Sequence, residues 1–542
     1  MAVERESGDE LAQDGRLRRA RLKGWLFEGA LLVSTLIGIV SLLVLFAEIT
    51  FDAIHPLTAS AQWYLTYFGT LVAPTAAFTL YARRHPAVRT ASAKAFAAVF
   101  GGLAVGLVTY AVLDAVSPYD VLIYLLFAGV PPVLVYAYGR SGDGSASFYV
   151  GPAIPVVTVI GLALGALLYG FVRPVVGIIA EWIAYYAAVA VPASGLLAVV
   201  VSRRWSRREG TLAAGSVLGA ALVLGGAGVA VGFDPSLWIV MLSVFVAPVG
   251  YVLGETIVTE PEGRVGLAGP FVLIGGVLLG AATVGKLGVS GPETFLTPNL
   301  LLNSWDGLNA SNAGIYPPIV GSIIIVGFMM TLSLPVGIGA AVYLEEYAPS
   351  SGWGGRLATL LEINISNLAG VPSVVYGLLG LALFRNTFGF GTGIVVSASG
   401  TLGILILPIV IVSTQEALRS VPDSLRDASY GMGASRWQTI RNVVLPEALP
   451  GTLTGTILSL ARAIGETAPL VIIAVATTTY STPDGLFSSA TALPLQIFAA
   501  RSNAVPEFRH GIVPAAAIVL LTLMLLMNAT AIVIRSRYDR SS

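Results

Sequence analysis

The sequence predicts an all-α polytopic membrane protein of about fourteen transmembrane helices, with both ends of the chain in the cytoplasm. Of its 542 residues, 55% are hydrophobic and only 11% are charged, whereas a soluble globular chain carries about 25% charged residues. The mean hydropathy is accordingly high, at +0.82. The apolar residues also gather into runs of roughly 20, the length that an α-helix needs to cross the core of a bilayer.

The apolar runs follow one another along the whole chain. The first nine lie at about 25–48, 63–82, 95–115, 119–138, 149–171, 177–201, 213–232, 236–254 and 266–285. The other five lie at about 316–343, 366–385, 393–414, 452–476 and 513–535. The first run is too long, and the basic segment before it too extended, for a cleaved signal peptide. We therefore expect it to remain as a helix.

Basic residues in the short loops predict the orientation, because loops rich in arginine and lysine stay in the cytoplasm. The N-terminal segment 1–24 holds Arg16, Arg18, Arg19, Arg21 and Lys23. If every run crosses once, the other basic loops also face the cytoplasm; they hold Arg83, Arg84, Arg89, Lys94, Arg140, Arg203, Arg204, Arg207 and Arg208, and the tail adds Arg535, Arg537 and Arg540. Removing one span would put several of these clusters outside, so the pattern favours an even number of spans.

The composition excludes several kinds of chemistry. Without cysteine the chain can form no disulfide, zinc-thiolate site or iron–sulfur cluster, and three scattered histidines are too few for a histidine metal centre. Equal numbers of basic and acidic residues, 30 of each, argue against nucleic acid as a partner. No Gly-x-x-x-x-Gly-Lys-Ser/Thr sequence is present to bind nucleotide phosphates. We therefore expect no catalytic site, bound cofactor or metal in this chain.

The two halves of the chain differ in their loops. Residues 25–260 form an accessory region of about eight helices joined by short loops, and no chemistry can be read from it. Residues 261–542 contain long outer segments at 286–315 and 477–512 and a cytoplasmic segment at 415–450. Long loops in otherwise compact proteins usually carry function. At the cytoplasmic end of the 316–343 span, Glu345 and Glu346 are expected to be solvated interfacial charges.

The cytoplasmic segment 415–450 predicts two short helices separated by a glycine break. Asp423 or Ser424 can cap the first helix, and Gly433 suits a left-handed helix stop. Ser435 can cap the second helix, which should end before Pro446. The charged residues expected on the exposed face are Arg426, Asp427, Arg436 and Arg441. Such a kinked knob is better suited to a groove on a cytoplasmic partner than to lying on the membrane.

The knob resembles the EAA loop of ABC-importer permeases. That family's pattern is Glu-Ala-Ala, three residues, Gly, nine residues, Ile, one residue and Leu-Pro, and here it reads Asp427-Ala428-Ser429, Gly433, Val443 and Leu445-Pro446. Asp, Ser and Val are mild departures at unchanged spacing. The resemblance implies a coupling helix that docks on a separate ATP-hydrolysing subunit. It assigns coupling to Glu416, Asp427, Ala428, Gly433, Leu445 and Pro446.

Neighbouring strings narrow the resemblance to the permeases of Pst phosphate importers. They are 335–347 (PVGIGAAVYLEEY), 370–377 (GVPSVVYG), 416–422 (EALRSVP) and 461–470 (ARAIGETAPL). Gly-Glu-Thr-Ala-Pro at 465–469 is similar to the PstA type, since the PstC type usually reads Gly-Glu-Thr-Met. The resemblance covers about residues 266–535 and does not extend to the first eight spans. It implies a six-span permease core in the plasma membrane.

The same resemblance implies the partners of such a core. They are a second permease chain of PstC type, cytoplasmic ATP-binding subunits that use ATP and magnesium, and an extracytoplasmic phosphate-binding protein. The binding protein would dock on the outer segments 286–315 and 477–512. Only one EAA-like loop is visible, so a second permease chain is needed.

Two groups of residues are candidates for the substrate pathway. Arg462 and Glu466 lie four residues apart near the middle of the 452–476 run, and Thr467 follows them. A charge at that depth is costly, so it should face protein or water. It either lowers the barrier for phosphate or forms an ion pair between helices. The other group is Pro372, Ser373 and Tyr376, which either line the pathway or serve ordinary helix packing.

Two other functions remain open. An ABC permease for sulfate, molybdate or phosphonate would share the coupling loop. A secondary transporter would predict acidic residues at mid-membrane and an internal repeat, and the sequence reading detects neither apart from Glu466. The accessory helices could brace the core, contact the partner permease or bind a regulator.

Overall fold

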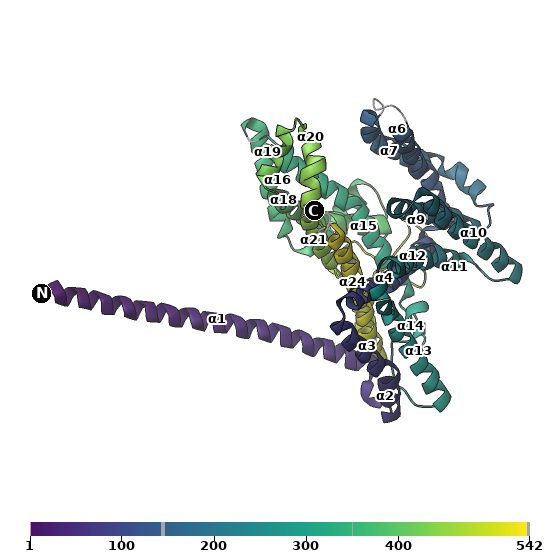
Figure 1. Cartoon of the computed structure of the whole chain (residues 1–542), viewed down its shortest axis with the longest axis horizontal. Coiled ribbons are helices and arrows are strands. Elements are labelled where there is room, and N and C mark those ends of the chain that lie inside the picture. Colours follow the sequence, from purple (N-terminus) through teal and green to yellow (C-terminus); the bar gives the residue numbers. More distant parts are fainter. Residues whose placement is uncertain (1, 142–146, 350, 539–542) are drawn as a thin grey trace.

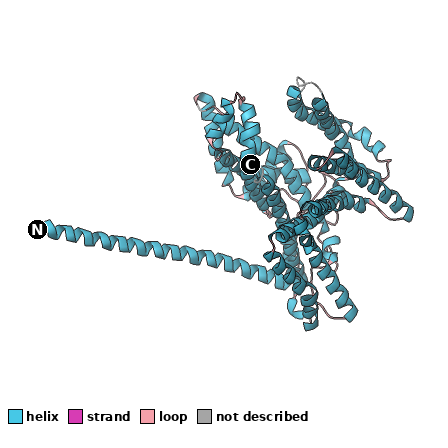
Figure 2. Ribbon diagram, viewed as in Figure 1, coloured by secondary structure: helices cyan, strands magenta, loops and turns pink. Residues whose placement is uncertain are grey.

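The computed structural model describes residues 2–141, 147–349 and 351–538, and this part of the chain consists of helices joined by loops and two isolated β-bridges (Figures 1 and 2). The predicted all-α fold is confirmed. The basic residues Arg16 to Arg21, Arg140 and the tail arginines Arg535, Arg537 and Arg540 lie outside the residues whose side chains are described.

Twelve helices of the described chain are long and apolar enough to cross a membrane. The helix α16 (Gly352–Ala369) and the segment Ser373–Thr387 are bent by 112° at a short break; together they form either a broken thirteenth span or a re-entrant loop. The fourteenth predicted run, 63–82, is helical but contains four threonines, which lower its hydropathy. It lies antiparallel to the span that ends at Leu287: Tyr67 and Thr70 approach Gly280, and Phe78 approaches Gly269. We count it as a span because it follows a membrane-crossing helix along its length.

The helices divide into a long first helix, an accessory bundle and a core. The first helix is α1 (Ala2–Ile54), which projects away from the rest in Figure 1. The accessory bundle comprises η1 (Pro56–Thr58), α2 (Ala61–Tyr67), η2 (Phe68–Val72), α3 (Ala73–Arg84), α4 (Pro86–Val116), α5 (Pro118–Tyr124), η3 (Leu125–Gly129), α6 (Val130–Ser141), α7 (Ser147–Val176), α8 (Glu181–Tyr185), η4 (Tyr186–Ala190), α9 (Val191–Arg204), α10 (Arg207–Val231), α11 (Ser236–Val240), η5 (Met241–Val246), α12 (Ala247–Thr259), η6 (Pro261–Ala268) and α13 (Gly269–Leu287).

The core surrounds a central group of long helices, in which α15 packs on α18, and α18 and α24 pack on α21. Its elements are α14 (Pro298–Leu302), α15 (Tyr316–Val342), η7 (Tyr343–Tyr347), α16, α17 (Ser373–Gly380), η8 (Leu381–Thr387), α18 (Val395–Arg419), α19 (Asp423–Gly431), α20 (Arg436–Thr439), η9 (Ile440–Val444), α21 (Leu445–Ile464), α22 (Ala468–Ile472), α23 (Leu493–Arg501), η10 (Phe508–Ile512) and α24 (Val513–Tyr538).

The accessory bundle is a fourfold repeat of one helical hairpin, which the sequence alone had not revealed. The first helix of each hairpin contains a π-helical segment (η2, η3, η4 or η5), and the second residue after each segment is a proline: Pro74, Pro131, Pro192 and Pro248. A proline has no N–H, and its ring crowds the carbonyl four residues earlier, so a wider π-turn relieves the clash. The shared position of this turn defines the repeat.

The second helix of each hairpin carries two small residues four positions apart. They begin 28, 30, 29 and 28 residues after the respective prolines and are Gly102 and Gly106, Gly161 and Gly165, Ala221 and Gly225, and Gly276 and Gly280. Small residues at this spacing let membrane helices approach closely. A Cβ on Gly161 would lie 2.1 Å from the Phe127 carbonyl oxygen, and one on Gly225 would lie 2.3 Å from the Trp182 ring. The second and third hairpins are therefore closed within themselves.

The first and fourth hairpins exchange partners. A Cβ on Gly276 would lie 2.7 Å from the Thr70 carbonyl oxygen, so α13 packs on the first helix of the first hairpin. A Cβ on Gly106 would lie 3.1 Å from Met241 Sδ, so α4 packs on η5 of the fourth hairpin. This exchange joins the beginning and the end of the accessory bundle.

The chain leaves the core for the accessory bundle and returns to the same place. The Phe295 N–H donates to the Ala53 carbonyl oxygen at 3.0 Å, and Glu293 N–H donates to Thr58 Oγ1 at 2.9 Å. The end of α1 also packs against η10 and α24 of the core. The predicted domain boundary near residue 260, between the accessory region and the core, stays a prediction. Although α13 follows that residue, it packs on α2 and α3 of the accessory bundle, and the end of α1 packs on the core.

Candidate functional site

The cytoplasmic knob is formed by α19 and α20, with Gly433 between them at φ +83°. The left-handed conformation predicted for Gly433 is confirmed. So is the Ser435 cap: Ser435 Oγ accepts from the Gln438 N–H at 3.3 Å, and the Ser435 N–H donates to Gln438 Oε1 at 2.8 Å. Inside the knob, the Ser429 and Thr439 hydroxyls lie 2.9 Å apart and are buried. The two helices are thus joined by a buried hydrogen bond.

Two predicted ends of these helices were wrong. Neither Asp423 nor Ser424 caps α19, because Pro422 occupies the cap position and Asp423 lies in the first turn. The second helix does not end before Pro446 but continues through η9 into α21 as one helix from Arg436 to Ile464. Pro446 follows the π-helical segment η9 at the same position as the prolines of the accessory repeat. The knob is therefore the cytoplasmic extension of a span.

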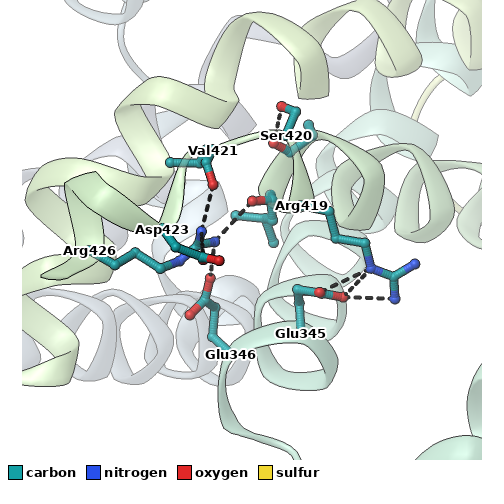
Figure 3. A network of polar contacts seen from close by, with 9 residues as sticks. Glu345, Glu346, Arg419, Ser420, Val421, Asp423 and Arg426 are labelled. Atoms are coloured by element: carbon teal, nitrogen blue, oxygen red, sulfur yellow. Dashed lines mark hydrogen bonds and ion pairs between the residues drawn. The ribbon is translucent and has the colours of Figure 1, made fainter.

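A buried ion pair holds the knob against the inner end of α15 (Figure 3). Arg426 Nη2 donates to Glu346 Oε1 at 3.0 Å, and the two side chains are only 16% and 9% exposed. Arg426 also donates to the carbonyl oxygens of Leu418 and Val421 at 3.0 and 2.7 Å. Leu418 lies in the last turn of α18 and Val421 two residues beyond its end, where carbonyl groups run out of helical N–H partners. Arg426 therefore satisfies a helix end as well as a carboxylate.

The expectation that Glu346 is solvated and that Arg426 lies on the exposed face was wrong. Both side chains are largely removed from water because the chain turns sharply between α18 and α19 and brings Arg426 against Glu346 of η7. A charge removed from water needs such a partner to remain ionised. The pair thus marks a fixed mechanical contact between the knob and α15.

A second and more exposed ion pair lies beside the first (Figure 3). Arg419, at the end of α18, donates through Nε to Glu345 Oε2 at 2.9 Å, and its side chain is 48% exposed. Glu416 and Glu362 lie 3.6 and 4.0 Å from the same guanidinium. Exposed pairs of this kind contribute little to stability. Arg426 and Glu346 therefore make the stronger link.

The outer surface of the knob is open and exposes large apolar side chains among charged ones. Its exposed large side chains are Leu425, Tyr430, Met432 and Trp437, and Met432 is 83% exposed. Of the predicted coupling residues, Glu416, Asp427, Ala428, Gly433 and Pro446 are exposed, and Leu445 is half-buried. A rigid knob with an exposed apolar surface can fill a groove on another protein.

The predicted pathway residues lie at breaks in two neighbouring helices. The continuous span predicted for 452–476 was wrong, because α21 ends at Ile464 and α22 begins at Ala468. The run is mostly apolar on both sides of this break, so averaged hydropathy could not reveal it. The other break separates α16 from α17 at Gly370–Pro372. The helices that follow the two breaks, α17 and α22, pack closely: a Cβ on Gly377 would lie 2.9 Å from Pro469 Cα.

Charged side chains lie at the break after α21, and the break before α17 holds a proline followed by a serine. Arg462 Nε donates to Glu466 Oε1 at 3.3 Å, with Arg462 46% and Glu466 15% exposed. Thr467 is half-buried beside them, Pro372 is exposed and Ser373 is half-buried. Tyr376 is 3% exposed, and its hydroxyl donates to the Leu368 carbonyl oxygen at 2.7 Å across the bend. Tyr376 therefore holds the bend, while Arg462 presents an accessible positive charge.

Sequence reasoning missed the Arg426–Glu346 contact. A signal was present, since Arg419 and Arg426 flank the corner after one span and Glu345 and Glu346 end another span on the same side. Among the described residues, no group of three or more His, Asp or Glu side chains is placed to hold a metal ion.

Comparisons with known proteins locate the similarity in the core. Residues 333–540 match the family described as the binding-protein-dependent transport system inner membrane component. The phosphate transport system permease protein PstA 1 of Mycobacterium tuberculosis (strain CDC 1551 / Oshkosh) is 36% identical over 223 residues, which cover 41% of this chain and 70% of the relative.

Two further relatives extend this comparison. The probable ABC transporter permease protein YqgI of Bacillus subtilis (strain 168) is 31% identical, over 41% of this chain and 78% of its own length. The phosphate transport system permease protein PstC of Haemophilus influenzae (strain ATCC 51907 / DSM 11121 / KW20 / Rd) is 29% identical, over 44% of this chain and 79% of its own length. The chain is longer than the region that these relatives match.

Proposed function

Because this chain belongs to the family of binding-protein-dependent transport system inner membrane components, as a multi-pass permease of the plasma membrane, we propose that it is the PstA-like subunit of an ATP-driven phosphate importer. Its similarity to phosphate permeases supports the substrate. The observation that carries the proposal is Arg462, an accessible cation at a helix break inside the core.

The two broken helices supply a path for an anion. Broken helices border substrate paths in other transporters, because their free ends offer polar backbone groups at membrane depth. The N–H groups at the start of α17 favour negative charge, and α17 packs against α22 beside the Arg462 break. Glu466 fixes the Arg462 side chain through its hydrogen bond. Arg462 would therefore lower the barrier for phosphate, with Ser373 and Thr467 as neutral hydrogen-bonding groups.

Energy would come from separate ATP-binding subunits that use ATP and magnesium. The exposed Leu425, Tyr430, Met432 and Trp437 would dock on one such subunit. Its motion would pass through Arg426 and Glu346 into α15. A second permease of PstC type would complete the pore, and a phosphate-binding protein would dock on the outer segments 286–315 and 477–512, where Leu308 and Tyr480 are exposed.

The test is uptake of labelled phosphate by cells that lack this gene and receive the wild-type chain or a variant. We expect Arg462→Ala to abolish uptake while the chain still reaches the membrane, because the path loses its cation. Arg385→Ala is the matched control, since Arg385 is an exposed arginine of the same core, and it should retain uptake. Normal uptake by Arg462→Ala would exclude this pathway.

Competition in the same assay separates phosphate from other oxyanions. Excess unlabelled sulfate, molybdate or phosphonate should not reduce uptake if phosphate is the substrate. If one of these anions competes, that anion is the substrate, and the roles assigned to the coupling residues stay the same. The accessory repeat lies outside the matched region 333–540, so it does not favour a secondary transporter.

A further inference from the structure

The accessory bundle contacts the core through the end of α4. Ala111 and Ala115 of α4 are 7% and 2% exposed and belong to the same apolar cluster as Val320 and Ile324 of α15. Between them, Asp114 Oδ2 accepts a hydrogen bond of 3.1 Å from the hydroxyl of Tyr316, the first residue of α15. The accessory bundle therefore grips the outer end of one core helix with both apolar and polar contacts.

The position of α4 is itself fixed by close packing against the rest of the accessory bundle. Gly102 and Gly106 let α4 pack directly on η5 and the start of α12, where a Cβ on Gly102 would lie 2.8 Å from Val249. At its other end, α4 stops at Val116, and Ser117 takes φ +70°, a conformation that is costly for a residue with a side chain. This turn directs the chain into α5 and fixes the position of Asp114 one turn earlier.

The outer end of α15 in turn holds part of the outer segment 477–512. The Leu493 N–H donates to Ser322 Oγ at 2.8 Å, and this bond is buried. A Cβ on Gly321 would lie only 2.0 Å from the Thr491 carbonyl oxygen, so the two backbones touch. The outer end of α15 and the loop around residues 491–493 are therefore packed directly on each other.

The inner end of the same helix carries the coupling contact, because α15 continues into η7 and ends at Glu345 and Glu346. One continuous segment, Tyr316–Tyr347, is thus fastened to the accessory bundle outside and to the knob inside. The two ends should control different steps, since the outer end supports the outer segment 477–512 and the inner end contacts the knob.

We propose that Asp114 and Tyr316 are positioning residues through which the accessory bundle holds the outer end of α15, and with it the loop at 491–493, in the geometry that receives the binding protein. This inference rests on the proposed function and gives the accessory helices a role in it. It predicts that weakening the grip changes the affinity for the binding protein more than the maximal rate.

The test uses the full-length chain, assembled with its partner subunits in lipid nanodiscs, and measures ATP hydrolysis as phosphate-loaded binding protein is added. Tyr316→Phe keeps the ring in the apolar cluster and removes only the hydroxyl. We expect the half-maximal concentration of binding protein to rise about five-fold, as for the loss of one solvent-exposed hydrogen bond. The maximal rate should stay within about two-fold, since the inner contacts are intact.

Three further variants make the test specific. Asp114→Ala should give the same shift, and the double variant should give no more than either single one, because both remove the same bond. Ser322→Ala, which breaks the link between α15 and Leu493 from the other side, should also raise the half-maximal concentration. Tyr110→Phe is the matched control, because Tyr110 lies one turn earlier on α4 and stacks on Tyr185 within the accessory bundle.

Each outcome has a defined meaning. The proposed role of Asp114 and Tyr316 would be refuted by an unchanged half-maximal concentration in Tyr316→Phe and Ser322→Ala. It would also be refuted by additive effects of Asp114→Ala and Tyr316→Phe, or by a loss confined to the maximal rate. Thermal unfolding of each complex shows whether a variant has lost its fold, and we expect no shift for Tyr316→Phe. If loaded binding protein fails to stimulate the wild-type complex, the proposed function fails instead.

Discussion

The substitution Arg426→Ala tests how the knob is connected to the membrane core. It leaves the Glu346 carboxylate, 9% exposed, without the guanidinium that now lies 3.0 Å away. It also removes the hydrogen bonds that Arg426 donates to the carbonyl oxygens of Leu418 and Val421. Removing one partner of a buried ion pair costs about 3–5 kcal/mol. Because Arg426 itself is 16% exposed, we take the lower end of that range.

A loss of about 3 kcal/mol should appear as local opening of the knob. Amide hydrogen exchange over residues 418–435 should quicken about a hundred-fold, since each 1.4 kcal/mol is a factor of ten. The same complex should hydrolyse more ATP per phosphate imported, because force from the ATPase no longer reaches α15. Both quantities can be measured on one reconstituted preparation.

Arg419→Ala is the matched control for this prediction. It removes the neighbouring arginine, which is 48% exposed, so it should cost at most about 1 kcal/mol. The double variant Arg426→Ala/Glu346→Ala should lose less than the sum of its single variants, because no buried charge remains unpaired. Equal exchange rates and an equal ratio of phosphate imported to ATP hydrolysed in Arg426→Ala and the wild type would refute the idea that Arg426 connects the knob to α15.

Two further predictions concern glycines. Gly433→Ala should destabilise the knob by about 1 kcal/mol, because φ +83° is unfavourable for a residue with a Cβ, and Gly433→Asp should uncouple ATP hydrolysis from transport; retained coupling in Gly433→Asp would contradict this role. Gly161→Leu should reduce the amount of folded chain in the membrane, since a Cβ there meets the Phe127 carbonyl oxygen at 2.1 Å, whereas Gly170→Leu, with open space around it, should not; equal amounts of both variants would argue against the hairpin packing.

Hydropathy and short-range signals predicted most of the fold. The apolar runs located the spans, because crossing a bilayer demands a fixed length of apolar helix. Gly433 and Ser435 were predictable as turn and cap, since both act through their own backbone neighbourhood. The EAA-like loop located the knob for the same reason, as its motif is continuous in sequence.

The remainder depended on contacts between distant segments. Glu346 reads as an interfacial charge until α19 folds back and brings Arg426 to it from 80 positions away. The break at Gly465 was invisible because apolar residues continue on both sides. The hairpin repeat has a signal in the sequence, since Pro74, Pro131, Pro192 and Pro248 recur at intervals of 57, 61 and 56 residues. These prolines could be recognised as equivalent only once the structure showed a π-helical segment before each of them.

The most direct test of the central claim is phosphate transport by the purified complex. The chain, a PstC-type partner, the ATP-binding subunits and a phosphate-loaded binding protein would be reconstituted in proteoliposomes, and labelled phosphate would be followed with and without ATP. The account predicts ATP-dependent phosphate movement that excess sulfate and molybdate do not reduce and that Arg462→Ala abolishes. Movement that needs no ATP, or that follows sulfate or molybdate instead, would contradict it.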